Sequence, residues 1–118
     1  MPTLIASLSI GKGTWGHVSR LIEEETWDKV ILITNDFGKE NFNRKDKVEL
    51  ISVKLETGLK DLRDEIHTIL KDKIKDTEVA VNFISGTGKE HMALIAALLR
   101  LGVGIRLVAL TKEGINEL

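Results

Sequence analysis

The stretch from Thr77 to Gly102 constrains the fold of this chain more than any other. It opens with an apolar run over residues 79–84, whose length and composition are typical of a buried parallel strand. Ser85-Gly86-Thr87-Gly88 then interrupts the run with small residues that permit a tight turn. From Lys89 to Leu101, apolar residues cover nearly the whole circumference of a helix, which predicts a helix buried on most sides.

This order of strand, glycine-rich turn and helix also suggests a ligand. The first N–H groups of a helix have no partner inside the helix, and the helix dipole places partial positive charge beside them. Lys89 adds a full positive charge at the same place. The simpler interpretation is a solvated lysine, but a cation in a first turn opposes the dipole. We therefore expect an anionic guest above the turn, and a phosphate in particular.

The composition excludes several other classes of function. A length of 118 residues fits one domain, and a net charge of -1 leaves no basic field to recruit nucleic acid, so we expect no direct DNA or RNA binding. The chain has no cysteine and its three histidines lack metal-ligand spacing, so neither a metal nor another cofactor is expected. It has no apolar run long enough to span a membrane and no secretion signal, which predicts a cytoplasmic protein without a membrane partner.

Apolar strands alternate with amphipathic segments along the whole chain, which predicts an α/β domain over residues 1–118. Strands are expected at residues 3–10, 30–34, 48–53, 79–84 and 103–110, and helices from Trp15, from 58 to 75 and from 89 to 101. Residues 39–47 are expected to be a loop or a frayed helix, and residues 111–118 show the start of a helical pattern. We therefore expect a three-layer, Rossmann-like, doubly wound and mostly parallel sheet of about five strands.

Two glycine-rich loops follow the first and fourth predicted strands. In a doubly wound sheet, ligands bind beyond the carboxyl ends of the strands, at the point where the strand order reverses. The first and fourth strands can be neighbours in such a sheet. Both loops would then line one crevice.

The first loop, Gly11-Lys12-Gly13-Thr14-Trp15-Gly16, matches the G-x-G-x-x-G fingerprint of dinucleotide-binding proteins. Asp36 ends the second predicted strand, where such proteins place an acid that binds ribose. Against this interpretation, Lys12 and Trp15 are bulky for a turn that a dinucleotide approaches closely, and no second domain holds a hydride donor or acceptor. The alternatives are therefore an NAD-type regulatory domain and glycines that simply make a tight turn.

Two further patterns are weaker. The second loop lacks the G-x-x-x-x-G-K-[ST] spacing of a phosphate-binding P-loop, and Glu90 stands where Ser or Thr would bind magnesium. His17 and His91 each follow a glycine-rich loop, so either could contact a phosphate or act as a general acid or base. A packed or surface histidine is the simpler interpretation of both.

The sequence from Asn82 to Met92, Asn-Phe-Ile-Ser-Gly-Thr-Gly-Lys-Glu-His-Met, resembles the signature of CARF domains, the CRISPR-associated Rossmann-fold sensors. Ser9-Ile10-Gly11-Lys12-Gly13-Thr14 is similar to the other ligand-facing loop of that family, and the order of elements fits along nearly the whole chain. The resemblance implies a homodimer that binds a cyclic oligoadenylate, most often the tetra-adenylate, in type III CRISPR antiviral signalling. It leaves open a free-standing sensor, a ring nuclease that degrades the ligand, or a piece of a protein with an effector domain.

The resemblance also implies which residues form the site. The implied ligand-binding residues are Gly11, Lys12, Gly13, Thr14, Ser85, Gly86, Thr87, Gly88, Lys89 and His91. A ring nuclease needs no metal, because the substrate's own 2′-OH attacks the adjacent phosphorus. Lys89 would stabilise charge on the phosphoryl oxygens and Ser9 would help to hold the geometry, which makes these two the catalytic candidates.

Overall fold

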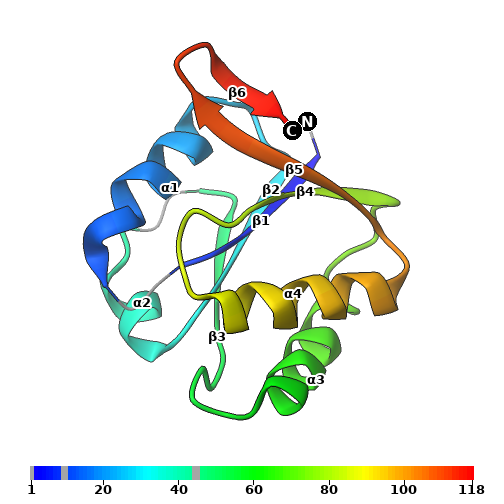
Figure 1. Cartoon of the computed structure of the whole chain (residues 1–118). Helices are drawn as coiled ribbons and strands as arrows, with labels where there is room; N and C mark the ends of the chain where they lie inside the picture. Colours follow the sequence, from blue (N-terminus) through cyan, green and yellow to red (C-terminus); the bar gives the residue numbers. More distant parts are fainter. Residues whose placement is uncertain (1, 9–10, 44–45) are drawn as a thin grey trace.

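The computed structural model describes residues 2–8, 11–43 and 46–118, and it confirms the predicted α/β class. One six-stranded sheet has the order β3-β2-β1-β4-β5-β6 (Figure 1). The strands are β1 (Thr3–Ser7), β2 (Lys29–Thr34), β3 (Val48–Ser52), β4 (Glu78–Asn82), β5 (Gly104–Thr111) and β6 (Gly114–Glu117). All neighbouring pairs are parallel except β5 and β6.

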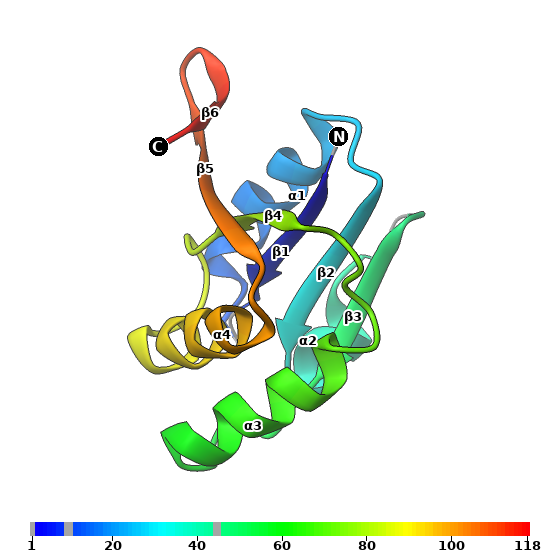
Figure 2. The same cartoon turned by 90° about the vertical axis from the view of Figure 1, so that its right-hand side faces the viewer.

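Helices lie on both faces of this sheet, so the molecule has the three layers that the alternating pattern predicts (Figure 2). The helical elements are the short 3-10 helix η1 (Lys12–Thr14), α1 (Trp15–Glu23), α2 (Asp36–Asn41), α3 (Leu59–Leu70) and α4 (Gly88–Leu101). On one face of the sheet, α1 buries Trp15, Val18 and Leu21. On the other face, α3 and α4 pack against each other and against the strands.

The central strands are buried on both faces, which explains their nearly continuous apolar sequences. In β1, Ile5 belongs to the core beneath α3 and α4, whereas Leu4 and Ala6 belong to the core beneath α1. Neighbouring residues in a strand point to opposite faces, so one short strand supplies both cores.

The end of the chain differs from the prediction, because residues 112–113 form a turn and Gly114–Glu117 form the strand β6, where the start of a helix was expected. β5 turns at Gly114, whose φ of 100° is in the left-handed region, and β6 returns antiparallel to β5. The resulting hairpin projects from the body of the molecule (Figures 1 and 2). Arg106 joins it to β4, donating to Glu78 at 2.7 Å and to Glu117 at 2.8 Å. The hydrogen bond to Glu117 raises the pKa of the Arg106 guanidinium most, and the hydrogen bond to Glu78 raises it further.

Two other predictions need correction. Residues 36–41 form the helix α2, capped by Asn35, whose side chain accepts from the Gly38 N–H at 3.0 Å. The frayed-helix alternative therefore holds for residues 39–41, but the helix begins earlier than predicted, at Asp36. Helix α4 buries only one face: Met92 is 60% exposed and Leu99 is 65% exposed. The physical reason is position, because α4 is an outer layer whose inner face alone meets the sheet and α3.

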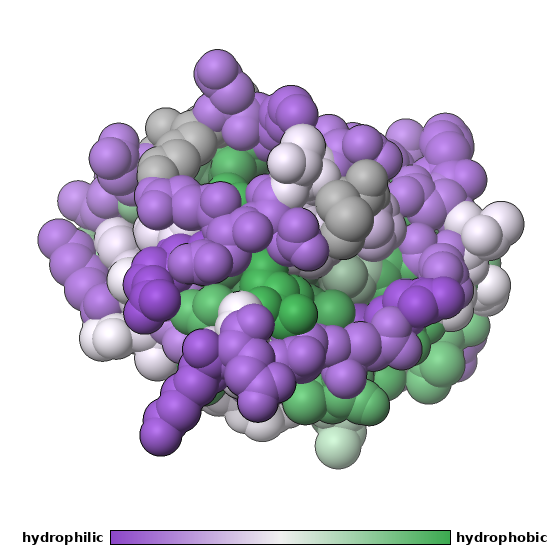
Figure 3. Space-filling model, turned by 90° about the horizontal axis from the view of Figure 1, so that it is seen from above, coloured by the Kyte–Doolittle hydropathy of each residue, from purple (hydrophilic) through white to green (hydrophobic). Residues whose placement is uncertain are grey.

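The surface is largely polar, with apolar side chains showing between the charged ones on the face seen in Figure 3. Within the part of the chain that the structure describes, no helix is long and apolar enough to cross a membrane. The described histidines and carboxylates also form no cluster suited to a metal ion.

Candidate functional site

The two glycine-rich loops meet where the strand order reverses. β1 and β4 are neighbours, as expected, and they lead to helices on opposite faces of the sheet. The hydroxyl of Thr14, at the end of the first loop, donates to Ser85 Oγ in the second loop at 2.6 Å. A direct side-chain contact thus joins the two loops at the place where doubly wound sheets bind their ligands.

The turn of the second loop requires glycine at position 86. Gly86 has a φ of 101°, which side-chain-bearing residues rarely adopt. A Cβ at this position would lie 2.9 Å from Glu90 Oε1, 3.0 Å from Ser7 Cβ and 3.1 Å from His91 Nε2. The tight turn predicted from the sequence is therefore both left-handed and crowded.

A reciprocal pair of hydrogen bonds closes the start of α4. Thr87 Oγ1 accepts from the Glu90 N–H at 3.4 Å and donates to Glu90 Oε2 at 2.9 Å. The acidic side chain in the first turn suits the helix dipole. Its carboxylate also lies close to Gly86, so an anion that binds here must lie beside this group or displace it.

His91 supports the second loop from inside the turn. Its Nε2 lies 2.7 Å from the carbonyl oxygen of Ser85, so this nitrogen carries the proton and donates. The ring also packs against Phe83, with 4.7 Å between the ring centroids. His91 thus holds the turn that the predicted ligand would contact, and its predicted contact with that ligand stays a prediction.

Lys89 is exposed and reaches away from the first loop. Its Nζ donates to the carbonyl oxygen of Leu55 in the segment after β3, at 3.0 Å. Lys12 is also engaged, with its Nζ 5.8 Å from the ring centroids of both Trp15 and Phe37. A phosphate contact by either lysine stays a prediction.

The first loop is much more open than the second. A Cβ placed on Gly11, Gly13 or Gly16 would meet nothing within 4 Å, and none of the three has a positive φ. In the dinucleotide fingerprint the third glycine allows close packing of helix and strand, whereas Gly16 faces open space. Asp36 accepts a hydrogen bond from Ser52 Oγ at 2.5 Å. The crowding expected from Trp15 is absent, because its ring lies in the core.

Two polar atoms near the loops lack a hydrogen-bond partner among the described residues: Ser7 Oγ and His17 Nε2, both buried. Ser7 ends β1 beneath Gly86, and sequence reasoning missed it. The available signal was a hydroxyl at the end of an otherwise apolar strand. Leaving a buried polar group unpaired costs about 1–3 kcal/mol, so such groups mark places where a polar ligand or water is favourable. Ser9, a catalytic candidate, lies outside the described residues.

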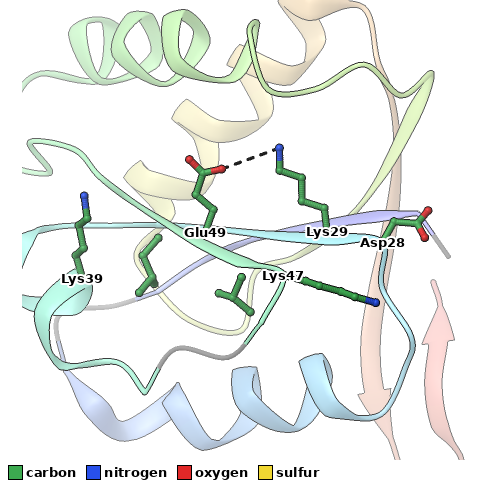
Figure 4. A pocket seen from close by; sticks show the side chains of 7 residues that line it. Asp28, Lys29, Lys39, Lys47 and Glu49 are labelled. Atoms are coloured by element: carbon green, nitrogen blue, oxygen red, sulfur yellow. Dashed lines mark ion pairs between the residues drawn. The ribbon is translucent and has the colours of Figure 1, made fainter.

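A hollow of about 610 Å³ lies elsewhere, along the outer edge of β3 (Figure 4). Lys29, Lys39 and Lys47 border it. Glu49 offsets part of that charge, because Lys73 Nζ lies 2.5 Å and Lys29 Nζ lies 4.0 Å from its carboxylate oxygens. This hollow is at an edge of the sheet and not at the strand ends that carry the glycine-rich loops.

No protein-family model matches the chain, and no curated protein matches it either. The CARF resemblance therefore rests on the residues of the two loops and on the order of the elements.

Proposed function

We propose that this protein binds a cyclic oligoadenylate, most favourably cyclic tetra-adenylate, as part of type III CRISPR antiviral signalling. The observation that carries the proposal is the Thr14–Ser85 hydrogen bond, which joins the two loops that resemble the ligand-facing loops of CARF domains. The open space above Gly11, Gly13 and Gly88 lets a ligand approach the backbone closely. The start of α4 supplies N–H groups and partial positive charge for a phosphate.

The proposed ligand is a ring of phosphates, which suits a pocket built from two copies of the chain. A two-fold homodimer repeats each patch, so two α4 starts and two copies of Lys89 would face one ring. The exposed apolar stripe on α4, which includes Met92 and Leu99, supports an interface between copies. A folded monomer leaves this stripe in water, and a second copy would cover it.

Cleavage of the ring is the second part of the proposal. In-line attack by a ribose 2′-OH on the adjacent phosphorus forms a 2′,3′-cyclic phosphate and breaks the bond to the 5′-oxygen, which leaves as a 5′-OH while the 2′-OH loses its proton. The step needs a fixed geometry and stabilisation of the charged phosphoryl oxygens, and it needs no metal. Lys89 can supply the charge by exchanging the Leu55 carbonyl for a phosphate oxygen, because its exposed side chain is free to change rotamer. Lys12 and Thr14, in the first loop, would hold the ribose.

Incubation with cyclic tetra-adenylate followed by chromatography tests the proposal, with linear tetra-adenylate as the matched control. A sensor retains the ring intact, and a ring nuclease converts it into shorter linear products. If the protein neither retains nor cuts the ring at micromolar concentrations, the proposal is wrong. A parallel titration with NADH addresses the dinucleotide alternative, for which the open Gly16 predicts no micromolar binding.

A further inference from the structure

A second hollow opens where β4 leaves the sheet while β5 continues. β4 pairs with β5 from Glu78 to Val81, opposite residues 104–107, whereas β5 extends to Thr111. Between the rest of β5 and the segment after β4 lies a hollow of about 310 Å³. It is next to the candidate site, because its wall residue Ile84 directly precedes Ser85.

The side chain of Asn82 ends the ladder between these strands. Its Nδ2 donates to the carbonyl oxygen of Val108 at 2.9 Å, and its Oδ1 accepts from the Ile84 N–H at 3.1 Å. The amide thus takes the place that a backbone N–H of a longer β4 would occupy. The backbone after Asn82 turns away, and the next rung of the ladder is missing.

The missing rung leaves the backbone of Leu110 unpaired. The Leu118 N–H donates to the carbonyl oxygen of Leu107 at 2.8 Å, so the backbone groups of Leu107, and of every second residue after it, face β6. Those of Val108 and Leu110 face the opposite way, toward β4. Val108 is bonded to Asn82, but the N–H and C=O of Leu110 have no partner among the described residues, and Leu110 borders the hollow.

The walls of the hollow are mostly apolar. Ile84 and Leu107 both line it, and they are 47% and 43% exposed, so two large aliphatic side chains are open to water here. The ring of His17 lines it from α1. An apolar slot with one donor and one acceptor side by side suits a planar heteroaromatic ring, because bases are recognised by apolar contact and by hydrogen bonds to their edges.

We infer that this hollow binds an adenine base of the ligand, with the Leu110 N–H donating to N1 of the ring and the exocyclic amine donating to the Leu110 carbonyl. The inference rests on the proposed function, which supplies the adenine. Because Ile84 leads directly into the loop at the start of α4, a base in the hollow and a phosphate at the helix are neighbours. In this arrangement backbone groups recognise the base, and for that reason the sequence carries no side-chain motif for the site.

Modified rings test the inference directly. Cyclic tetra-adenylate should shift the amide NMR signal of Leu110. A ring built from N6,N6-dimethyladenosine lacks the exocyclic donor, and we expect it to bind about tenfold weaker or worse and to leave the Leu110 signal in place. A ring of 7-deazaadenosine keeps the hydrogen-bonding edge and should bind within about twofold of the natural ring.

A pair of variants provides the second test. Leu110→Pro removes the free N–H without removing a hydrogen bond to β6, whereas Leu110→Ala keeps the N–H and loses the side chain. We expect affinity for cyclic tetra-adenylate to fall at least about fivefold more in Leu110→Pro than in Leu110→Ala. If Leu110→Pro fails to fold, the modified rings decide the question.

The outcomes separate this inference from the proposed function. If the natural ring binds but the Leu110 signal does not move, or if the dimethyl ring binds equally well, the base lies elsewhere and the proposed function stands. If no ring binds in the chromatographic assay, the proposed function fails and the inference fails with it. A Leu110 signal that shifts with protein concentration alone identifies a second copy as the occupant, which contradicts a base site.

Discussion

The two glycine-rich loops at the switch point have similar compositions but different physical characters. In the second loop, Gly86 is left-handed and crowded by three side chains, and Thr87 closes a reciprocal cap with Glu90. In the first loop, Gly11 and Gly13 face open space and have ordinary backbone angles. The folded chain therefore requires glycine in one loop, and in the other it leaves room for something outside the chain.

This difference distinguishes two structural roles of glycine. A glycine with positive φ and close neighbours serves the fold, and its replacement is expected to change stability. A glycine in open space contributes little to the stability of the fold, and the absence of a side chain there lets a ligand reach the backbone. The first loop and Gly88 at the start of α4 are thus the places to look for ligand approach, whereas Gly86 belongs to the rigid part of the second loop.

The largest expected effect concerns the charge of the second loop. Lys89→Ala should weaken cyclic tetra-adenylate binding by about two to four orders of magnitude if two copies of a charge-assisted contact are lost. Isothermal titration measures this. Lys112→Ala, on the exposed turn of the hairpin, is the control and should leave affinity unchanged. If the Lys89→Ala variant binds within threefold of the unmodified protein and melts at the same temperature, Lys89 does not contact the ligand and its hydrogen bond to the Leu55 carbonyl is a surface contact.

The next effect contrasts the glycines directly. Gly86→Ala should lower the free energy of unfolding by about 2–4 kcal/mol, because the backbone strain adds to clashes with Ser7 and the side chains from α4. Gly13→Ala should change it by no more than about 0.5 kcal/mol. Urea denaturation of both variants gives the comparison. Equal losses in the two variants contradict the distinction between the loops.

The cap of α4 should have a smaller effect. Thr87→Ala removes both hydrogen bonds between Thr87 and Glu90 and is expected to cost about 1 kcal/mol of stability. Thr87→Ser keeps the hydroxyl and serves as the control, with a change of less than about half of that. Thermal unfolding followed by circular dichroism is sufficient. A neutral Thr87→Ala variant indicates that the second loop is held by Gly86 and His91 alone.

The smallest effect concerns the link between the loops. Thr14→Val removes the hydrogen bond to Ser85 while keeping the shape of the side chain, and it should cost about 0.5 kcal/mol. Amide hydrogen exchange should show faster exchange in the first loop and little change in α4. Unchanged exchange in both loops means that they are held independently.

Much of this arrangement follows from local sequence patterns. Apolar runs such as residues 79–84 predict the central strands, and the glycines after them predict the turns. The neighbouring positions of β1 and β4 follow from the general behaviour of doubly wound sheets. These features depend on a few consecutive residues or on rules of topology.

Other features depend on contacts between distant parts of the chain. Lys89 donates to Leu55, 34 residues earlier, and no local pattern encodes that choice of rotamer. The hairpin at the end of the chain escaped prediction because residues 111–118 are mostly polar and the Lys112-Glu113 turn lacks a strong hairpin signal. The unpaired Leu110 backbone follows from where β4 stops, which the sequence does not mark.

The free edge of β3 has a consequence for how the protein behaves in concentrated solution. The Val30 N–H donates to Lys47, so β3 turns the backbone groups of every second residue, Val48 and Leu50 among them, away from β2. The unpaired backbone groups of such an edge can pair with a strand of another copy, which leads to aggregation. Charged side chains flank this edge, with Lys47 just before β3 and Lys54 shortly after it. Lysines at a sheet edge oppose the pairing of two copies, and added salt weakens this protection by screening their charges.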